Sequence, residues 1–212
     1  MTRDQSFPPT LGAILAGGLA RRLGGGDKPL RAVGHAPVLT RLIERLAPQV
    51  RRLILNANDD PRRFEEFGLP VVPDSLPGHP GPLAGVLAAL EWAGRFDPDI
   101  AWVLSVPGDA PFLPRDLVSR LHAERHRGGA TFACAASNGR THPVVGLWPV
   151  SIRDELRHAL AVDGIRKIDA FTARRPTVAV DWTAEPVDPF FNVNTPADLA
   201  EADRLAAAHP GL

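Results

Sequence analysis

The sequence predicts an α/β fold in three layers, with helices on both faces of a mostly parallel, Rossmann-like sheet. Apolar runs typical of buried strands alternate along the first half of the chain with stretches of helical periodicity. The strand expected at residues 11–15 leads into a glycine-rich loop and then a helix, an order that α/β proteins use to hold phosphate groups. At 212 residues the chain can form one such domain around a sizeable core.

The first half is expected to supply four parallel strands joined by helices. Val38, Leu42 and Leu46 recur at helical spacing and predict a helix from about residue 37, which Pro48 ends. After the strand at 11–15, further strands are expected at 52–56, 70–72 and 101–106, and further helices at 62–67, 83–94 and 115–127. Because right-handed crossovers join parallel strands, the carboxyl ends of these strands should meet at one edge of the sheet.

The second half is less regular. Strands are expected at 131–136, 143–148 and 177–180, helices at 151–161 and 164–172, and an extended segment at 190–194. Thr195 should cap a last helix that has Pro196 in its first turn. Since no repeat or linker interrupts the pattern, we expect a single domain spanning residues 1–212.

Composition excludes several classes of function. Lys and Arg together number 24, as do Asp and Glu, so the formal net charge is zero, which argues against a general nucleic-acid surface. The single cysteine, Cys134, allows no internal disulfide and points to a reducing compartment. The sequence has no run of about 18 apolar residues and no apolar N-terminal signal, so we expect no membrane span and a cytoplasmic location.

The loop after the first strand combines two glycine clusters with basic side chains, among them Arg22 and Lys28. Glycine lets the backbone approach an anion closely, and the free N–H groups point at its oxygens. The loop is not a P-loop, because Pro29 rather than Ser or Thr follows the lysine, and its glycines do not match the dinucleotide fingerprint G-x-G-x-x-G. It is a third kind of phosphate loop, in which we expect Lys28 to act on the phosphates as a point charge.

Four residues lie at the carboxyl ends of the expected strands: Gly17, Asn56, Asp74 and Asp109. Asp109 comes after a buried strand and a Pro-Gly turn, and its hard carboxylate oxygens suit Mg²⁺, which binds through one or two carboxylates plus substrate phosphates. A carboxylate at Asp74 would suit the base or ribose edge of a nucleotide. For Asp74 and for Asn56, the role of an ordinary turn residue is equally compatible with the sequence.

Asn192 and Asn194 lie two residues apart in an extended segment and therefore point to the same side. They either meet a polar substrate or hold the last helix in place, and the sequence leaves both roles open. No side-chain pair resembles a nucleophile with its base. Phosphoryl-type transfer needs none, because positioning, cations and a metal ion can carry the catalysis when the incoming phosphate is already ionised.

Together these residues resemble the molybdenum cofactor guanylyltransferase family, also called the molybdopterin-guanine dinucleotide synthases. The matching motifs run in the family's order over residues 15–196: Leu15-Ala16-Gly17-Gly18, Arg21-Arg22, Gly24-Gly25, Asp27-Lys28, Asn56-Ala57-Asn58, Asp74-Ser75-Leu76, Pro80-Gly81-Pro82-Leu83-Ala84-Gly85, Pro107-Gly108-Asp109-Ala110-Pro111-Phe112, His142-Pro143 and Asn192-Val193-Asn194-Thr195-Pro196. The first block is shared by many nucleotidyltransferases, whereas the blocks at 74–85 and 192–196 are more specific. The sequence departs from the family at Gly108, where Cys is common, and at Pro29 after the lysine. We expect Gly108 to loosen the turn without removing the carboxylate that follows.

The resemblance implies a nucleotidyltransferase architecture and a reaction in which the terminal phosphate of molybdenum-molybdopterin attacks the α-phosphorus of GTP and releases pyrophosphate. It implies GTP contacts at Leu15, Ala16, Gly17, Gly18, Lys28, Asn56, Asp74 and Asp109, a catalytic set of Lys28, Asp109 and Arg22, Mg²⁺ on Asp109, and Asn192 and Asn194 toward the pterin. The half up to about residue 115 would then bind GTP, and the remainder would face the pterin substrate. Molybdopterin-loading proteins and apo-molybdoenzymes are further candidate partners.

Two other functions stay open. A cytidylyltransferase would use CTP on the same pterin, but such enzymes tend to carry Leu-Ala-Ala-Gly, and Gly17 at the third place leaves more room for a purine. A GTP-binding protein that only delivers the cofactor would keep the loop but would not need Asp109. Sugar-nucleotide pyrophosphorylases fit less well, because their Gly-Thr-Arg loop signature is absent.

Overall fold

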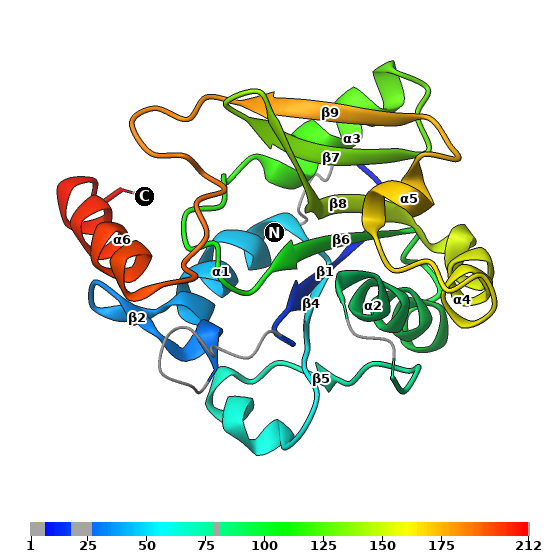
Figure 1. The fold of residues 1–212 in the computed structure, drawn as a ribbon, viewed down its shortest axis with the longest axis horizontal. Coiled ribbons are helices and arrows are strands. Elements are labelled where there is room, and N and C mark those ends of the chain that lie inside the picture. The colour runs from blue at the N-terminus through cyan, green and yellow to red at the C-terminus, as the bar shows by residue number, and fades with distance from the viewer. Residues whose placement is uncertain (1–6, 18–26, 79–80, 212) are drawn as a thin grey trace.

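The computed structural model describes residues 7–17, 27–78 and 81–211. Its main feature is a seven-stranded sheet in the order β5-β4-β1-β6-β8-β7-β9 (Figure 1). The strands are β1 (Thr10–Leu15), β4 (Arg52–Asn56), β5 (Val71–Val72), β6 (Trp102–Pro107), β7 (Phe132–Ser137), β8 (Arg140–Pro149) and β9 (Thr177–Trp182). Only the pairings of β8 with β6 and with β7 are antiparallel, so the expected mostly parallel α/β sheet is confirmed.

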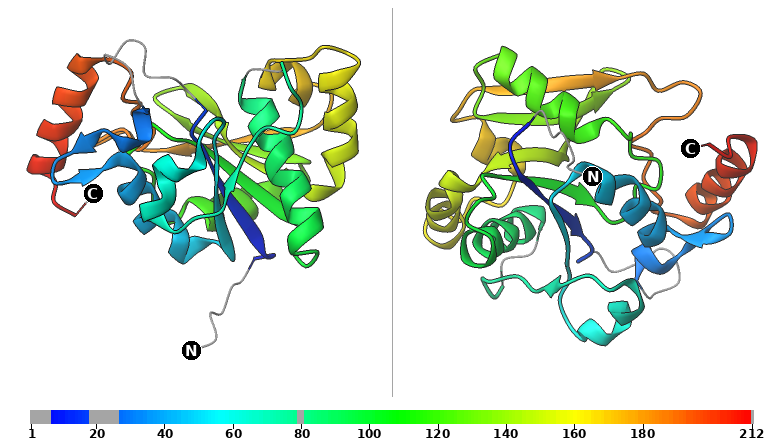
Figure 2. Two further views of the ribbon diagram at one scale, coloured as in Figure 1. Left: turned by 90° about the horizontal axis from the view of Figure 1, so that it is seen from below. Right: turned by 180° about the vertical axis from the view of Figure 1, so that it is seen from behind.

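Helices cover both faces of this sheet. The α-helices are α1 (Val38–Leu46), α2 (Pro82–Phe96), α3 (Leu117–Arg127), α4 (Arg153–Ala161), α5 (Ile168–Thr172) and α6 (Pro196–Ala208). Buried residues of α1, α3 and α6 belong to one apolar cluster, and those of α2, α4 and α5 to another. The two groups of helices therefore form the outer layers of the expected three-layer arrangement (Figures 1 and 2).

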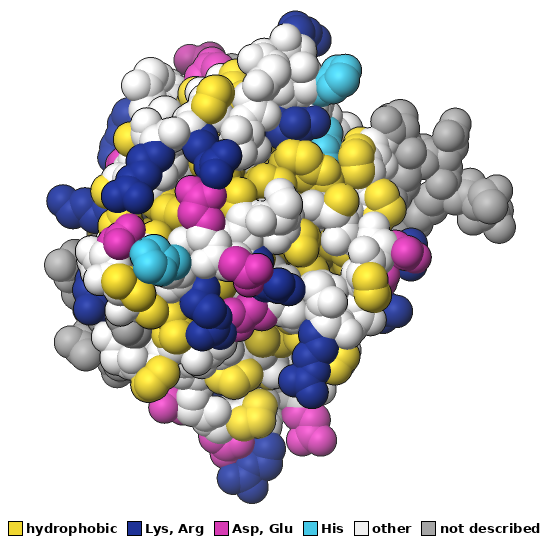
Figure 3. Space-filling view, turned by 90° about the vertical axis from the view of Figure 1, so that its right-hand side faces the viewer, with side chains coloured by type: hydrophobic (Ala, Val, Ile, Leu, Met, Phe, Trp, Pro, Cys, Tyr) yellow, Lys and Arg dark blue, Asp and Glu magenta, His cyan; other side chains and the backbone are white. Residues whose placement is uncertain are grey.

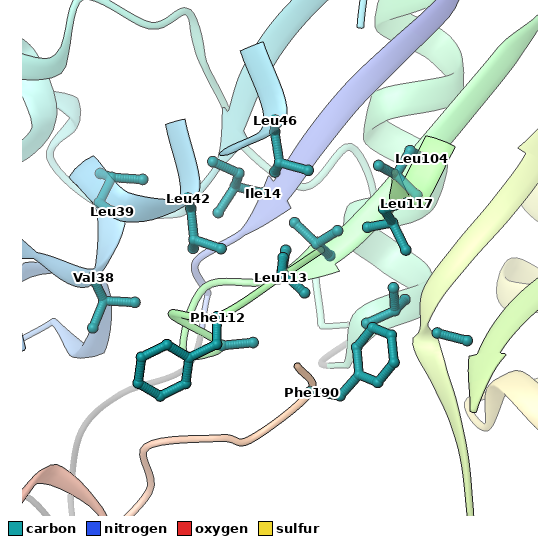
Figure 4. Packing of buried hydrophobic residues seen from close by; sticks show 14 of the residues in the cluster. Ile14, Val38, Leu39, Leu42, Leu46, Leu104, Phe112, Leu113, Leu117 and Phe190 are labelled. Atoms are coloured by element: carbon teal, nitrogen blue, oxygen red, sulfur yellow. The ribbon is translucent and has the colours of Figure 1, made fainter. Parts of the chain in front are cut away.

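The strands of the sheet divide their side chains between the two clusters. In β4, Leu53 and Leu55 pack with the cluster of α1, whereas Ile54 between them packs with the cluster of α2, as the alternation of side chains along a strand requires. Figure 4 shows the first cluster from close by, with Ile14 of β1 facing Leu42 and Leu46 of α1. Burial on both faces explains why these strands read as continuous apolar runs in the sequence.

Short elements differ from the sequence expectation. A small hairpin of β2 (Ala32–Val33) and β3 (Ala36–Pro37) follows a 3-10 turn, η2 (Lys28–Leu30), and was not predicted. The short helix expected near 62–67 is a 3-10 helix, η4 (Pro61–Phe67), and two more 3-10 turns, η3 (Ala47–Gln49) and η5 (Val150–Ile152), flank α1 and α4. The helix expected at 164–172 begins only at Ile168, because Gly164 has a left-handed φ of 66° that ends the preceding turn.

The distribution of charged side chains on the surface agrees with the formal net charge of zero. On the face shown in Figure 3, Lys and Arg side chains are interspersed with Asp and Glu side chains. Within the described ranges, none of the helices is long and apolar enough to cross a membrane.

Candidate active site

The carboxyl ends of four parallel strands lie level at one edge of the sheet. Leu15 of β1 pairs with Asn56 of β4 and Pro107 of β6, and Asn56 is the neighbour of Val72 of β5. The chain places β4 and β5 on one side of β1 and then returns to form β6 on the other side. This reversal of strand order is the place where α/β sheets bind ligands, because the loops after the two central strands diverge there.

Lys28, Asp109 and Asn194 meet at this reversal, and we call them the Lys28 cluster. Lys28 Nζ donates hydrogen bonds to Asp109 Oδ2 at 3.0 Å and to Asn194 Oδ1 at 2.5 Å. The side chains of Lys28 and Asp109 are 20% and 15% exposed, so the ion pair is mostly shielded but reachable from solvent. The structure therefore brings residues 28 and 109, which are expected at the nucleotide, next to residue 194, which is expected toward the pterin; their contacts to substrate stay predictions.

Asp109 retains one oxygen without a partner. Its Oδ1 is buried and makes no hydrogen bond within the described part of the chain. A buried carboxylate oxygen normally finds a donor or a cation, because leaving it unpaired is costly. No cluster of three or more His, Cys, Asp or Glu ligands is found in the ranges the structure describes. The unpartnered oxygen of Asp109 suits Mg²⁺, which binds through one or two carboxylates together with phosphate oxygens and water.

The segment that carries Asn194 is fixed to the site by its backbone. Val193 N donates to Asp109 O at 2.8 Å, and Asp198 Oδ2 accepts from Asn194 N at 2.9 Å and Thr195 N at 2.8 Å. Burial alone would raise the pKa of Asp198, but these backbone hydrogen bonds, the Thr195 hydroxyl and the charge of Lys28 hold that pKa below its usual value. Thr195 and Asp198 form a capping box, so the predicted cap of the last helix is confirmed.

A second group of polar residues anchors the start of the same segment. Ser137 Oγ lies 2.9 Å from Asp188 Oδ1 and 2.8 Å from His142 Nε2, and Asp188 Oδ1 also accepts from Phe190 N. Burial lowers the pKa of His142, which favours the neutral imidazole. Because a carboxylate only accepts, the Ser137 hydroxyl donates to Asp188 and accepts from His142. The serine is therefore a structural link and is not activated as a nucleophile.

At the β4 and β5 ends, Asp74 is held by Asn56 and Asn58, and we call these three residues the Asp74 clasp. Asn56 Nδ2 donates to Asp74 Oδ1 at 2.9 Å, and Asn58 Nδ2 donates to Asp74 Oδ2 at 2.9 Å. Asn58 Oδ1 accepts in return from Asp74 N at 2.9 Å. Each carboxylate oxygen thus keeps a lone pair for a further donor while its position is fixed.

The first turn of α2 packs directly on the Asp74 clasp. Asn56 is 4% exposed, and its amide nitrogen also donates to Val72 O at 3.0 Å, so both of its N–H groups are engaged. A Cβ atom at Gly85 would lie 2.2 Å from Asn56 Oδ1. Gly85 is therefore needed for close approach of α2, which explains a glycine in a helix despite its cost there. A GTP contact of Asn56 stays a prediction.

Gly108 is packed tightly rather than loosely. A Cβ atom there would lie 2.9 Å from Pro29 Cγ and 3.1 Å from Leu15 O, while Gly108 N donates to Leu15 O at 2.9 Å. The two departures from the family pattern, Gly108 and Pro29, are thus in contact with each other. The turn before Asp109 requires a small residue because the proline ring fills the space beside it, so the expectation of a looser turn is wrong.

The structure describes some, but not all, of the remaining residues that the sequence predicts for the site. Gly18 and Arg22 lie outside the described residues. Leu15 and Ala16 make backbone hydrogen bonds to Gly108 and Asn56, and Asn192 is exposed. Leu15, Ala16, Gly17 and Asn192 stay predictions as contacts to substrate.

Sequence reasoning did not assign a role to Asn58, Asp27 or Arg63. Asn58 follows Asn56 by two residues, a spacing that places both on one side of an extended segment and could have indicated the second arm of the clasp. Arg63 lies in η4 and carries no comparable signal.

The chain is similar to known proteins over most of its length. Residues 12–178 match the family described as the MobA-like NTP transferase domain. A molybdenum cofactor guanylyltransferase from Nitrobacter hamburgensis is 58% identical over 205 residues, which are 97% of this chain and 98% of that protein.

Solved structures show the same fold. The chain is similar to molybdopterin-guanine dinucleotide biosynthesis protein A from Archaeoglobus fulgidus, with a TM-score of 0.73 and 24% identity over 93% of this chain and 99% of that one. It is also similar to a Mycobacterium tuberculosis protein in complex with manganese, with a TM-score of 0.66 and 16% identity over 94% of this chain and 100% of that one.

Proposed function

The chain belongs to the MobA-like NTP transferase family, and from this membership we propose that it transfers GMP from GTP to the terminal phosphate of molybdenum-molybdopterin. The products are the molybdopterin guanine dinucleotide cofactor and pyrophosphate. The chain is a nucleotidyltransferase, and the guanylyltransferase named among its relatives supports GTP as the donor.

The observation that carries the proposal is the Lys28 cluster at the reversal of strand order. Lys28 has three N–H donors and uses two of them on Asp109 and Asn194, which leaves one for a phosphate oxygen. Since Lys28 can only donate, Asn194 must turn its carbonyl oxygen toward it and its NH₂ group away. That NH₂ group is suited to donate to an oxygen of the incoming pterin phosphate.

The reaction needs positioning and charge more than a base. An oxygen of the pterin's terminal phosphate forms a bond to the α-phosphorus of GTP, and the bond from that phosphorus to the bridging oxygen of the β-phosphate breaks, so the electron pair leaves with pyrophosphate. Lys28 stabilises the negative charge that builds on the phosphate oxygens. Asp109 would hold Mg²⁺, which neutralises phosphate charge when bound. Arg22, which belongs to the same glycine-rich loop in the sequence, is proposed to add a further positive charge.

The Asp74 clasp favours guanine over the other bases. Guanine presents two adjacent donors, N1–H and its amino group, which match the two oxygens of a carboxylate. Adenine and cytosine present an acceptor beside a single amino group, so each would place a lone pair against Asp74. A site built to accept two hydrogen bonds rejects ligands that lack one donor. The fixed orientation of Asp74 therefore supports GTP over CTP.

The two halves of the chain are proposed to divide the substrates. Residues up to about 115 supply Lys28, Asp74 and Asp109 to the nucleotide, and the second half supplies Asn192 and Asn194 to the pterin side within one domain of 212 residues. We further propose a cytoplasmic location and transfer of the product to apo-molybdoenzymes.

The test is turnover of molybdenum-molybdopterin with GTP, CTP or ATP in the presence of Mg²⁺. The expected result is pyrophosphate release and formation of the dinucleotide with GTP alone. Preferential use of CTP would indicate a cytidylyltransferase instead of a guanylyltransferase. Binding of GTP with no product from a competent pterin would favour a delivery protein.

A further inference from the structure

Arg63 of η4 connects the two parts of the candidate site. Its Nη1 donates to Asp27 Oδ1 at 2.7 Å and to Asp27 Oδ2 at 2.9 Å, and its Nη2 donates to Asn58 O at 2.7 Å. Its Nε donates to Asp60 O at 3.0 Å, so every nitrogen of the guanidinium group is engaged. The planar, rigid fork of arginine allows these contacts to be made together.

Asp27 places a negative charge directly beside Lys28, the lysine proposed to act on the phosphates. It precedes Lys28 in the sequence, its side chain is 11% exposed, and it makes no cap hydrogen bond to η2. A carboxylate so well shielded from water is screened poorly, so its field reaches neighbouring charges. Without Arg63, the Asp27 carboxylate would have no cationic partner among the described residues, and its negative charge would lie beside Lys28.

We propose that Arg63 is a positioning residue for nucleotide binding, which cancels the charge of Asp27 next to Lys28 and ties the Lys28 segment to the Asp74 clasp. The proposal rests on the proposed function, since it assumes that phosphates bind at Lys28. Arg63 need not touch the nucleotide in this role. Its contact with Asn58 O steadies the residue whose side chain holds Asp74.

If Arg63 acts by cancelling the charge of Asp27, its loss should affect the nucleotides differently, which a purely structural role would not predict. Repulsion by an unpaired Asp27 increases with the negative charge of the ligand, so its effect should grow with the number of phosphates. Loss of the tie to Asn58 would weaken all guanine nucleotides equally, because each carries the same base. A direct contact from Arg63 to phosphate would persist as a loss even when Asp27 is neutral.

The experiment is calorimetric titration of GMP, GDP and GTP into the full chain with Mg²⁺, for the wild type, Arg63→Gln, Asp27→Asn and the double variant. We expect Arg63→Gln to weaken GTP binding about tenfold, which corresponds to about 1.4 kcal/mol, and GMP binding much less. In the double variant both members of the ion pair are replaced by neutral amides and no unpaired charge remains, so GTP affinity should return to within about threefold of the wild type. Arg62→Gln is the matched control, because it removes the same charge from a neighbouring side chain that is 83% exposed and pairs only with Asp60 in the described ranges.

Other outcomes overturn the proposal. An equal loss for all three nucleotides, or a loss that Asp27→Asn does not restore, would exclude the charge role. If the glutamine variant does not fold, as judged by its thermal transition, Arg63→Lys replaces it; this variant keeps the charge without the fork and should bind GTP within about threefold of the wild type. Equal GTP affinity of the wild type and Arg63→Gln would overturn the role of Arg63 alone, whereas a wild type that binds no nucleotide overturns the proposed function and this proposal together.

Discussion

The Lys28 cluster and the Asp74 clasp lie at the same edge of the sheet but hold their carboxylates in opposite ways. Asp109 shares one oxygen with a cation and keeps the other buried and unpartnered within the described chain, whereas both oxygens of Asp74 accept from asparagine amides. A carboxylate with an unpaired oxygen can take a metal ion, while one held at both oxygens is fixed in direction. This difference is the basis for proposing charge chemistry at the Lys28 cluster and base selection at the Asp74 clasp.

The largest expected effect comes from removing the carboxylate of Asp109, whose Oδ1 has no partner among the described residues. Asp109→Ala should abolish turnover with Mg²⁺, because it removes the only carboxylate of the Lys28 cluster. Asp109→Asn, which keeps the shape but not the charge, should do the same. Pyrophosphate release measures the activity, and circular dichroism with a thermal transition checks that the fold is intact. Near-normal turnover in either variant would remove the metal-binding role of Asp109.

Removing the cation of the same cluster should have the next largest effect. Lys28→Ala is expected to cost about 2.7–4 kcal/mol of transition-state stabilisation, the range seen for other fixed charge stabilisers. The loss should appear in kcat as well as in kcat/KM, measured by steady-state kinetics with GTP. A change confined to KM would show that Lys28 binds the ground state and transition state equally. Lys28→Arg is the charge-preserving control.

The comparison also separates what the sequence could predict from what it could not. Asn56, Asp74 and Asp109 were identifiable because each ends an apolar strand, and parallel strands bring their ends to one edge. The partners of these residues were harder to predict. Asn194 reaches Lys28 across 166 positions of sequence, a contact that depends on the path of the chain, and its role toward a substrate stays a prediction.

The missed elements share a physical cause. The strands β2 and β3 contain two residues each, too few to show a period of two. Arg63 lies in a 3-10 helix whose sequence has no distinctive pattern, and its partners Asp27 and Asn58 come from separate loops. Hydrophobic periodicity identifies helices and strands that bury one face. Contacts between loops do not produce such a pattern and therefore cannot be predicted from it.

A smaller effect is expected at the Asp74 clasp. Asp74→Asn should reduce the preference for GTP over ATP by about 1–3 kcal/mol, because an amide offers one acceptor where the carboxylate offers two. Competition titrations with the two nucleotides measure the preference. Asn58→Ala keeps the charge but frees Oδ2, so it should lower the preference less than Asp74→Asn does. Unchanged discrimination in Asp74→Asn would move Asp74 to a structural role.

The smallest effect on the site is expected from His122, which lies near the opposite end of β1. It is 4% exposed and lies 2.8 Å from the hydroxyl of Thr10, at the first residue of the strand. That hydroxyl donates to Pro8 O, so it accepts from His122 Nε2, which therefore carries a hydrogen. Burial, together with the charge of Arg125, lowers the pKa of His122 to about 4.

The lowered pKa of His122 makes the fold, rather than the site, sensitive to mild acid. An unfolded histidine has a pKa of about 6.5, so between that pH and about 4 the unfolded state binds the extra proton, and unfolding becomes easier as pH falls. The stability present above pH 6.5 should drop by up to about 3 kcal/mol across this window. Urea unfolding at pH 7.5 and pH 5 measures the part of this drop that occurs above pH 5, about 2 kcal/mol. His122→Asn should flatten the dependence, leaving the part of the same sign that comes from His142, whose pKa burial also lowers. If the variant loses as much stability as the wild type between these two pH values, the acid sensitivity arises elsewhere in the fold.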